Sequence, residues 1–135
     1  MFLKNILICL FIIFSTFQLY AQNNPDAVLG SWYNSTKKSR IEIYKCGEKY
    51  CGKIAWLQEP DNEEGKPKID KNNPDAKLQN RPILGIGLMK DFKYASKNVW
   101  EEGEIYDPQS GKTYSCKMTL TDKDHLEEAT LAFSS

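Results

Sequence analysis

Residues 40–57 read RIEIYKCGEKYCGKIAWL, and this stretch decides the fold. Two runs that alternate apolar and polar residues flank a short glycine-containing loop between Cys46 and Cys51. An alternation with a period of two is typical of strands, and a short loop with glycine joins antiparallel strands. The stretch therefore predicts a β-hairpin, in which Ile54 and Trp56 share one face of the second strand.

The chain begins with the features of a secretion signal. Lys4 supplies a positive start, residues 6–14 are apolar, and Ala21 is a small residue at a suitable cleavage position. The apolar run is shorter than the ~20 residues that span a bilayer. We predict that residues 1–21 are a signal peptide and that residues 22–135 form one β-barrel domain, exported to the periplasm or the extracellular space.

Charge points to no particular class of partner. The chain has 18 basic and 18 acidic side chains, and the predicted cleavage removes Lys4 and no acid. The sequence shows no basic stripe for nucleic acid and no polybasic patch for anionic lipid. We expect no nucleic-acid binding and no stable membrane insertion after cleavage, and the oligomeric state stays open.

Three of the four cysteines follow the predicted cleavage site. In an oxidising compartment, Cys46 and Cys51 are expected to form a disulfide, whose short loop contributes ~2 kcal/mol. Free thiols and a metal or redox site are the alternatives, but redox pairs usually have two intervening residues, and His125 is the only histidine. Alternation over residues 112–120 places Cys116 on an apolar face, which predicts a core thiol.

The remaining pattern is that of an all-β protein. Further strands are expected at 28–33, 83–89, 98–106 and 112–120, and two glycines in the second of these indicate a bent strand or a close backbone approach. Short strands separated by regular turns favour a closed barrel or a sandwich. Residues 58–80 are polar and rich in turn residues, and a loop of this length is often functional.

A set of short motifs follows one order along the chain: Gly30-Ser31-Trp32, Ser39 to Tyr44, the Cys46 to Cys51 loop with Gly52, Trp56-Leu57, Asp70 to Pro74, Arg81 to Gly85, and Ile105 to Pro108 with Gly111 to Tyr114. Together they resemble the bacterial family catalogued as domain of unknown function 2147, over roughly residues 26–126. The resemblance implies an exported, small antiparallel barrel of the calycin or lipocalin type. It implies no established reaction and suggests binding of a small, apolar ligand.

Two further points depend on this resemblance. Gly30-x-Trp32 is similar to the lipocalin signature, in which the tryptophan plugs one end of the barrel. Family members usually continue with an Arg-Gly-Tyr-Ile-Gly-like segment and a final strand that contains tryptophan, whereas this match fades after Leu126 and residues 128–135 lack those motifs. We therefore expect a C-terminally truncated, incomplete barrel with unpaired edges, and hypothesise a frameshift as the cause.

Aromatic and arginine side chains are the candidates for a ligand site, because pockets are mostly apolar with a few placed polar groups. Aromatic rings can line a cavity, and arginine can orient an anionic head group. The alternative is that the rings fill the core and the arginines form ordinary ion pairs. The candidates are Trp32, Arg40, Tyr44, Trp56, Arg81, Trp100, Tyr106 and Tyr114.

No catalytic residue, cofactor or metal site is expected. The sequence contains no nucleophile elbow, zinc spacing or phosphate loop, and His125 has no motif around it. Acidic residues at 61–64 and 70–75 offer oxygen ligands for calcium, but neither run has the EF-hand order, and turn chemistry explains both.

The sequence therefore predicts an exported lipocalin-like protein that binds a small hydrophobic or amphipathic molecule. The rival hypothesis is an interaction module of the cell envelope without a ligand cavity. Its 58–80 loop or its open edge would contact another protein or a glycan.

Overall fold

The computed structural model describes residues 23–122 and 125–133, with side chains up to residue 121; the predicted signal peptide and the side chain of His125 lie outside it. The elements are η1 (Pro25–Val28), β1 (Gly30–Tyr33), β2 (Ser39–Cys46), β3 (Lys49–Leu57), η2 (Ala76–Leu78), β4 (Gly87–Ser96), β5 (Val99–Asp107), β6 (Lys112–Asp122) and β7 (His125–Phe133). Neither of the two short helices in these ranges is long and apolar enough to cross a bilayer.

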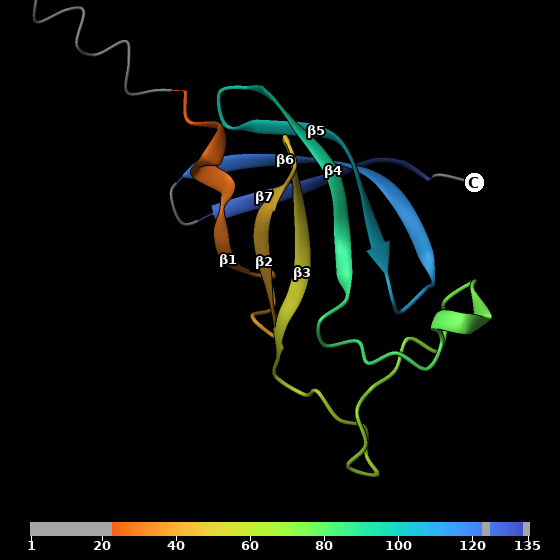
Figure 1. Cartoon of the computed structure of the whole chain (residues 1–135). Coiled ribbons are helices and arrows are strands. Elements are labelled where there is room, and N and C mark those ends of the chain that lie inside the picture. Colours follow the sequence, from red (N-terminus) through yellow and green to blue (C-terminus); the bar gives the residue numbers. More distant parts are fainter. Residues whose placement is uncertain (1–22, 123–124, 134–135) are drawn as a thin grey trace, which may run out of the picture.

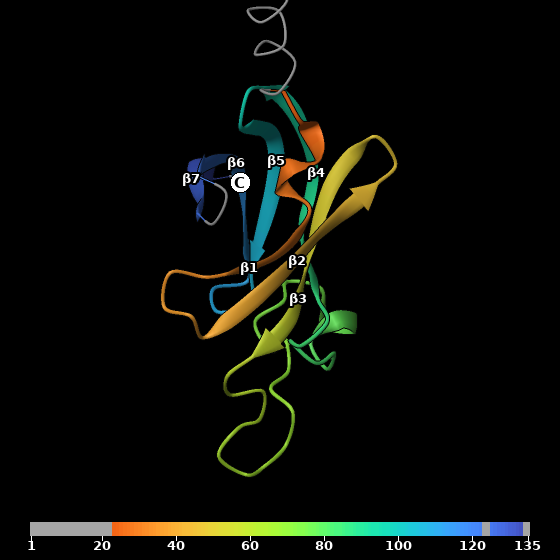
Figure 2. The ribbon, with the colours of Figure 1, turned by 90° about the vertical axis from the view of Figure 1, so that its left-hand side faces the viewer.

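The strands form one antiparallel sheet in the order β1-β2-β3-β4-β5-β6-β7, so every strand pairs with its neighbour in sequence. The sheet curls into a half-barrel, with β1 to β3 crossing in front of β5 and β6 (Figures 1 and 2). Strands β1 and β7 are the edges of this order. The predicted all-β antiparallel barrel fold is thereby confirmed, and over the described residues it has the form of a half-barrel.

The β2–β3 hairpin forms as the alternation predicts. Tyr44 pairs with Cys51, and Cys46 pairs with Lys49 next to the turn. A disulfide joins Cys46 and Cys51, whose Cα atoms lie 5.9 Å apart. The predicted disulfide is confirmed, and Cys116 is a free, buried thiol, as its position in the alternation indicates.

One face assignment in this hairpin was wrong. Arg40 pairs with Trp56, but the next residue, Ile41, pairs with Ile54, so Ala55 is an extra residue in β3. Such a bulge reverses the side-chain alternation beyond it. Ile54 is therefore buried, whereas Trp56 is 38% exposed on the outer face.

The third apolar run also differs from its prediction. Only Gly87 and the residues after it belong to β4, which continues to Ser96 through a polar segment. The preceding residues are held beside β3 by two single hydrogen bonds, from Gly85 N to Ile54 O and from Ile54 N to Ile86 O. Gly85 has a positive φ of 95°, which explains the need for glycine there.

The middle of the half-barrel is tightly packed. Phe92 and Trp100 are fully buried, together with Met89 and Met118. A Cβ atom on Gly103 would overlap the Phe92 ring, so this glycine lets the ring lie directly on the backbone of β5. The core is thus filled by side chains at this level.

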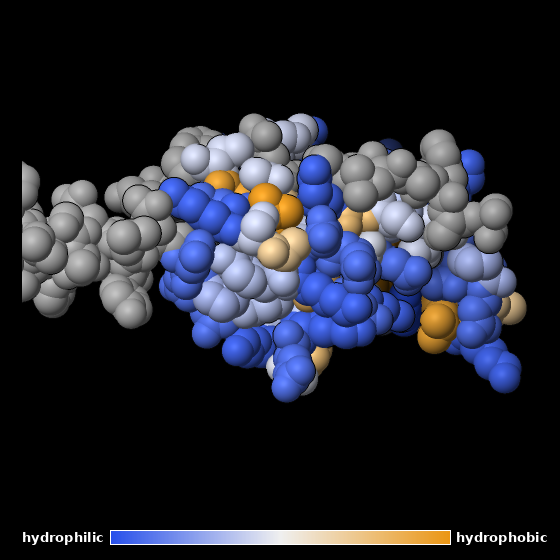
Figure 3. Space-filling model, turned by 90° about the horizontal axis from the view of Figure 1, so that it is seen from above, coloured by the Kyte–Doolittle hydropathy of each residue, from blue (hydrophilic) through white to orange (hydrophobic). Residues whose placement is uncertain are grey.

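Helix η1 lies at the end of the sheet where the β2–β3 and β4–β5 hairpins turn (Figure 1). The indole of Trp32 donates to Val28 O at 2.7 Å, and that of Trp100 donates to Pro25 O at 3.0 Å. The Tyr50 hydroxyl donates to Asp26 Oδ1 at 2.6 Å. We call this the closed end; seen from above, its coloured surface is mainly hydrophilic, with small separate hydrophobic patches (Figure 3).

Candidate ligand-binding site

A cavity of about 440 Å³ lies at the opposite end, which we call the mouth. Its base is apolar and comes from the inner faces of β2, β3 and β4 and from the segment before β4. These apolar residues are Ile41, Ile54, Leu57, Ile83 and Leu88. This volume is within the range of pockets that bind small molecules.

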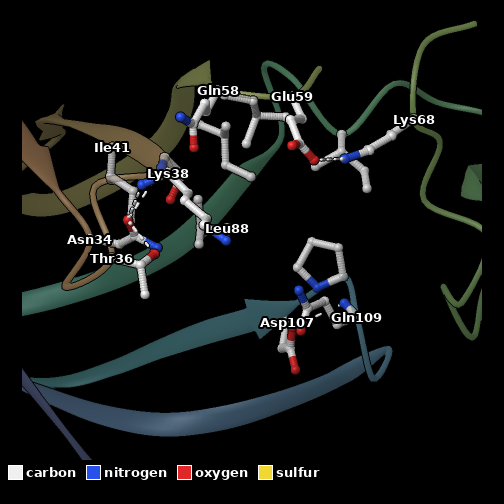
Figure 4. Close-up of a pocket in the computed structure, with 15 residues that line it drawn as sticks. Asn34, Thr36, Lys38, Ile41, Gln58, Glu59, Lys68, Leu88, Asp107 and Gln109 are labelled. Carbon is white, nitrogen blue, oxygen red and sulfur yellow. Dashed lines mark hydrogen bonds and ion pairs between the residues drawn. The ribbon is translucent and has the colours of Figure 1, made fainter. Parts of the chain in front are cut away.

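The rim of this mouth cavity is polar (Figure 4). Lys68 forms an ion pair with Glu59 at 3.7 Å. The Asp107 carboxylate accepts hydrogen bonds from the backbone N–H of Gln109 at 2.9 Å and from the Ser110 hydroxyl at 2.8 Å. Charged groups of both signs and amides thus surround an apolar base, an arrangement suited to a molecule with one apolar and one polar end.

Three connections bring these rim residues together: the β1–β2 turn, the long loop of residues 58–86, and the β5–β6 turn. The β1–β2 turn is ordered by Asn34, whose Oδ1 accepts from the backbone N–H groups of Lys38 at 2.9 Å and Ser39 at 3.2 Å. Asparagine is favoured in such turns because its side chain bonds to the nearby backbone. The up-and-down topology places all three connections at one end.

A buried carboxylate fastens the long loop to the barrel. Asp70 is fully buried and accepts from the Tyr106 hydroxyl at 2.6 Å, from Arg81 Nε and Nη2 at 3.0 Å each, and from Asn73 Nδ2 at 2.8 Å. A buried charge is tolerated only when it is paired and hydrogen-bonded. Burial, and secondarily the bond to Asp70, raises the pKa of Tyr106 to about 12.

Asn72 makes a second attachment between the long loop and the β5–β6 turn. Its side-chain amide donates to Gln109 O at 2.8 Å and to Pro108 O at 3.3 Å. Gly111 has a φ of 72°, and a Cβ atom there would overlap the Asn72 carbonyl. The loop therefore rests directly on the turn, and two walls of the mouth are fixed to each other.

The closed end holds a second tyrosine–carboxylate pair. Burial, and then the hydrogen bond to Asp26, raises the pKa of Tyr50 to about 12. The Tyr50 hydroxyl and, after it, Lys45 lower the pKa of Asp26. Lys45 lies 3.2 Å from Asp26 Oδ1 at the surface. This pair attaches η1 to β3 at the closed end.

The predicted ligand residues do not come together at the mouth cavity, because none of the eight is among the described residues that line it. Trp100 is fully buried, and Trp32 packs against the core. Tyr44 and Trp56 are 39% and 38% exposed, and the Trp56 ring meets Tyr33 edge-on with centroids 6.0 Å apart. Trp100 and Trp32 therefore fit the alternative hypothesis, in which the aromatic rings fill the core.

The remaining four predicted ligand residues lie at other positions in the fold. Arg81 and Tyr106 belong to the Asp70 network, and the Arg81 guanidinium also lies 6.0 Å from the Tyr106 ring centroid. Arg40 pairs with Tyr33 and Trp56 in neighbouring strands and has a buried Nε without a hydrogen-bond partner among the described residues. Tyr114 is half-buried on β6, opposite Ile105.

The prediction from the sequence missed the residues that line the cavity, because it considered only aromatic and arginine side chains. The base of the cavity consists of aliphatic side chains, and much of its rim consists of turn residues. A usable signal was present. Ile41 and Ile54 lie on the inner face of the predicted hairpin, and Gln58 and Glu59 follow its second strand directly. Residues at strand ends that precede long loops line the openings of barrels.

Comparison with known proteins agrees with this fold. A solved structure from the human pathogen Helicobacter pylori, described as belonging to the lipocalin family, matches with a TM-score of 0.59 and 24% sequence identity. The alignment covers 74% of this chain and 66% of that protein, so this chain spans less than two thirds of its length. No curated protein matches.

A family model matches residues 30–132, a range that includes the β2–β3 hairpin, the long loop and most of β7. The matched range continues past Leu126, where the motif resemblance had been expected to fade. The chain therefore belongs to the family of uncharacterized proteins conserved in bacteria that is termed DUF2147.

Proposed function

We propose that this protein, once exported, binds a small hydrophobic or amphipathic molecule in the mouth cavity. The observation that carries the proposal is an apolar base of aliphatic side chains beneath a polar rim, in a cavity of about 440 Å³. Each methylene group moved from water into such a base contributes about 0.8 kcal/mol. The lipocalin-like fold of the Helicobacter pylori neighbour supports a binding role, and the proposal includes no chemical step.

The shape of the interior limits the ligand. Met89 and Phe92 are fully buried in the middle of the half-barrel, and Trp100 and Met118 are fully buried nearer the closed end. A ligand therefore enters from the mouth and stops above these side chains, and its polar end stays near Lys68 at the rim. This geometry favours a single short apolar tail over a bulky, fully buried molecule.

The rival hypothesis of an interaction module has one observation in its favour. Tyr33 is 58% exposed and Trp56 is 38% exposed, and both lie on the outer face beside Arg40. Aromatic side chains and arginine are enriched where proteins bind other proteins. The mouth cavity supports small-molecule binding over this rival, which required an interior without a cavity.

Two measurements test the binding proposal. Native mass spectrometry of the protein isolated from its source cells should reveal a reproducible co-purifying small molecule. In thermal-shift assays, decanol and decanoate should raise the melting temperature of the wild-type protein and of Leu84→Glu. They should not raise that of Leu57→Glu, which places a charge in the base of the cavity. Leu84 is 46% exposed and does not line the cavity, so it is the matched control.

Two results would count against binding in the mouth cavity. One is the repeated absence of any bound molecule together with no thermal shift for any amphiphile. The other is an equal loss of response in both leucine variants while circular dichroism shows that both are folded.

A further inference from the structure

A second cavity of about 850 Å³ adjoins the mouth cavity. It lies between the long loop and the β5–β6 turn, and the same side chains form the boundary between the two spaces. The shared residues are Lys68, Ile83, Pro108 and Gln109. The larger space is therefore an extension of the proposed ligand site toward the surface.

The charges that line this second cavity all have one sign. Lys66, Lys68 and Lys71 line it, and no carboxylate is among the described residues that do so. The whole chain has equal numbers of basic and acidic side chains, so this concentration of positive charge is local. We call this space the lysine cavity. Clefts lined by one sign of charge concentrate ligands of the opposite sign.

The present partners of these lysines are exchangeable. Lys66 lies 3.5 Å from Glu64, and Lys68 lies 3.7 Å from Glu59; the two glutamate side chains are 74% and 82% exposed. Exposed ion pairs of this kind contribute little to stability. Lys71 is exposed and has no ion pair with any described residue. A ligand anion can therefore replace the glutamates at small cost.

The walls of the lysine cavity are held in place before any ligand arrives. Asn72 joins the loop to the backbone of Pro108 and Gln109, and Asp70 holds Arg81 at the base of the loop. Because Arg81 is already paired with a fully buried carboxylate, it is not available as the anion-binding cation. The lysines take that place.

We propose that the two adjoining cavities bind one anionic, single-chain amphiphile, with its apolar tail in the mouth cavity and its anionic head group among Lys66, Lys68 and Lys71. This inference rests on the proposed function and adds the charge of the ligand. Carboxylate, sulfate and phosphate head groups share the required chemistry.

Isothermal titration calorimetry with ligands of one tail length tests the head group. Decanoate and decyl phosphate should bind more tightly than decanol, and decyltrimethylammonium should bind more weakly than decanol. The double variant Lys66→Gln/Lys71→Gln should weaken decanoate binding about fivefold to tenfold and leave decanol binding unchanged. Raising the salt concentration should reduce the preference for decanoate, because exposed charges are screened.

The matched control is Lys53→Gln/Lys90→Gln, which removes the same charge from exposed positions on β3 and β4 that line neither cavity. It should bind decanoate as the wild type does. Acetate and inorganic phosphate, which have no tail, should bind far more weakly than decanoate.

The outcomes separate this inference from the proposed function. Equal affinity for decanoate and decanol, or an equal effect of both double variants, overturns the anionic head group and leaves small-molecule binding intact. Binding of tail-less phosphate as tightly as decyl phosphate shows a simple anion site and overturns the two-cavity arrangement. No binding of any of the decyl compounds overturns both proposals.

Discussion

The Tyr106 hydroxyl donates a 2.6 Å hydrogen bond to Asp70 Oδ1, and this bond joins β5 to the long loop that walls the mouth. Asp70 is fully buried, so the bond connects a phenol to a desolvated charge. The bond therefore bears on both the stability of the barrel and the shape of the cavity.

Removing this hydroxyl should destabilise the protein and loosen the loop. We expect Tyr106→Phe to lower the free energy of unfolding by about 1.5–3 kcal/mol, the usual contribution of a hydrogen bond to a charged group. Urea unfolding measures the loss, and amide exchange should quicken first in residues 58–86. Tyr44→Phe, on an exposed ring, is the control. Equal stability of both variants would show that the bond contributes nothing.

A larger side chain at Gly103 should destabilise the protein, because the Phe92 ring packs directly against this glycine. Gly103→Ala places a methyl group into the Phe92 ring, and overpacking of a core typically costs about 1–3 kcal/mol. Gly87→Ala is the control, because a Cβ atom there meets nothing within 4 Å. The additional change Phe92→Leu should restore part of the loss in Gly103→Ala, as thermal unfolding of the three variants can show. A Gly103→Ala protein as stable as Gly87→Ala would contradict the packing.

Stability should fall at high pH because of the two phenols that donate to carboxylates, Tyr50 and Tyr106. The pKa of both Tyr50 and Tyr106 is raised from 10.0 to about 12 in the folded protein. The unfolded chain releases these protons above pH 10, whereas the folded chain keeps them until about pH 12. Their contribution is therefore complete below about pH 10 and is lost as the pH rises toward 12.

Urea unfolding at several pH values between 9 and about 11.5 measures this effect. The double variant Tyr50→Phe/Tyr106→Phe, which is less stable at neutral pH, should show a shallower decline. Ultraviolet titration of the folded wild type should show two tyrosines that ionise later than the rest. Parallel pH profiles for the two proteins would refute the assignment.

The disulfide should make a modest contribution. Cys46 and Cys51 are five residues apart, and closing such a short loop in the unfolded chain stabilises the fold by about 2 kcal/mol. Cys46→Ser/Cys51→Ser should lose that amount in urea unfolding and should no longer respond to a reducing agent. The wild type under reducing conditions should match it. Cys116 should react with a thiol reagent only after unfolding, because it is buried.

The sequence predicted the fold well where local pattern decides structure. The hairpin over residues 40–57, the strand over 112–120 and the role of Cys116 all follow from alternation with a period of two. The prediction was weaker for β4, whose first apolar residues lie before the strand and whose remainder is polar. The tail that forms β7 lacks a comparable pattern, so its strand was not predicted.

The candidate site could not be read in the same way. Trp56 lies on the outer face, and not on the predicted inner face, because a single extra residue, Ala55, shifts the pairing of β2 and β3. Arg81 looked like an anion-binding group, but the fold brings it to a buried Asp70 eleven residues earlier in the chain. Neither the bulge at Ala55 nor the Asp70–Arg81 pair can be recognised from the local sequence, because both depend on which groups meet across the sheet and the loop.

By itself, the sequence determined the class of fold, the hairpin and its disulfide, because strand alternation and cysteine spacing are local properties. Only the tertiary structure decided where the two cavities lie. The mouth cavity is formed by Ile41, Leu57 and Leu88 from three strands, and the lysine cavity by loop residues and the β5–β6 turn. These groups meet because antiparallel topology brings three separate connections to one end of the sheet, and a buried carboxylate holds the longest of them there.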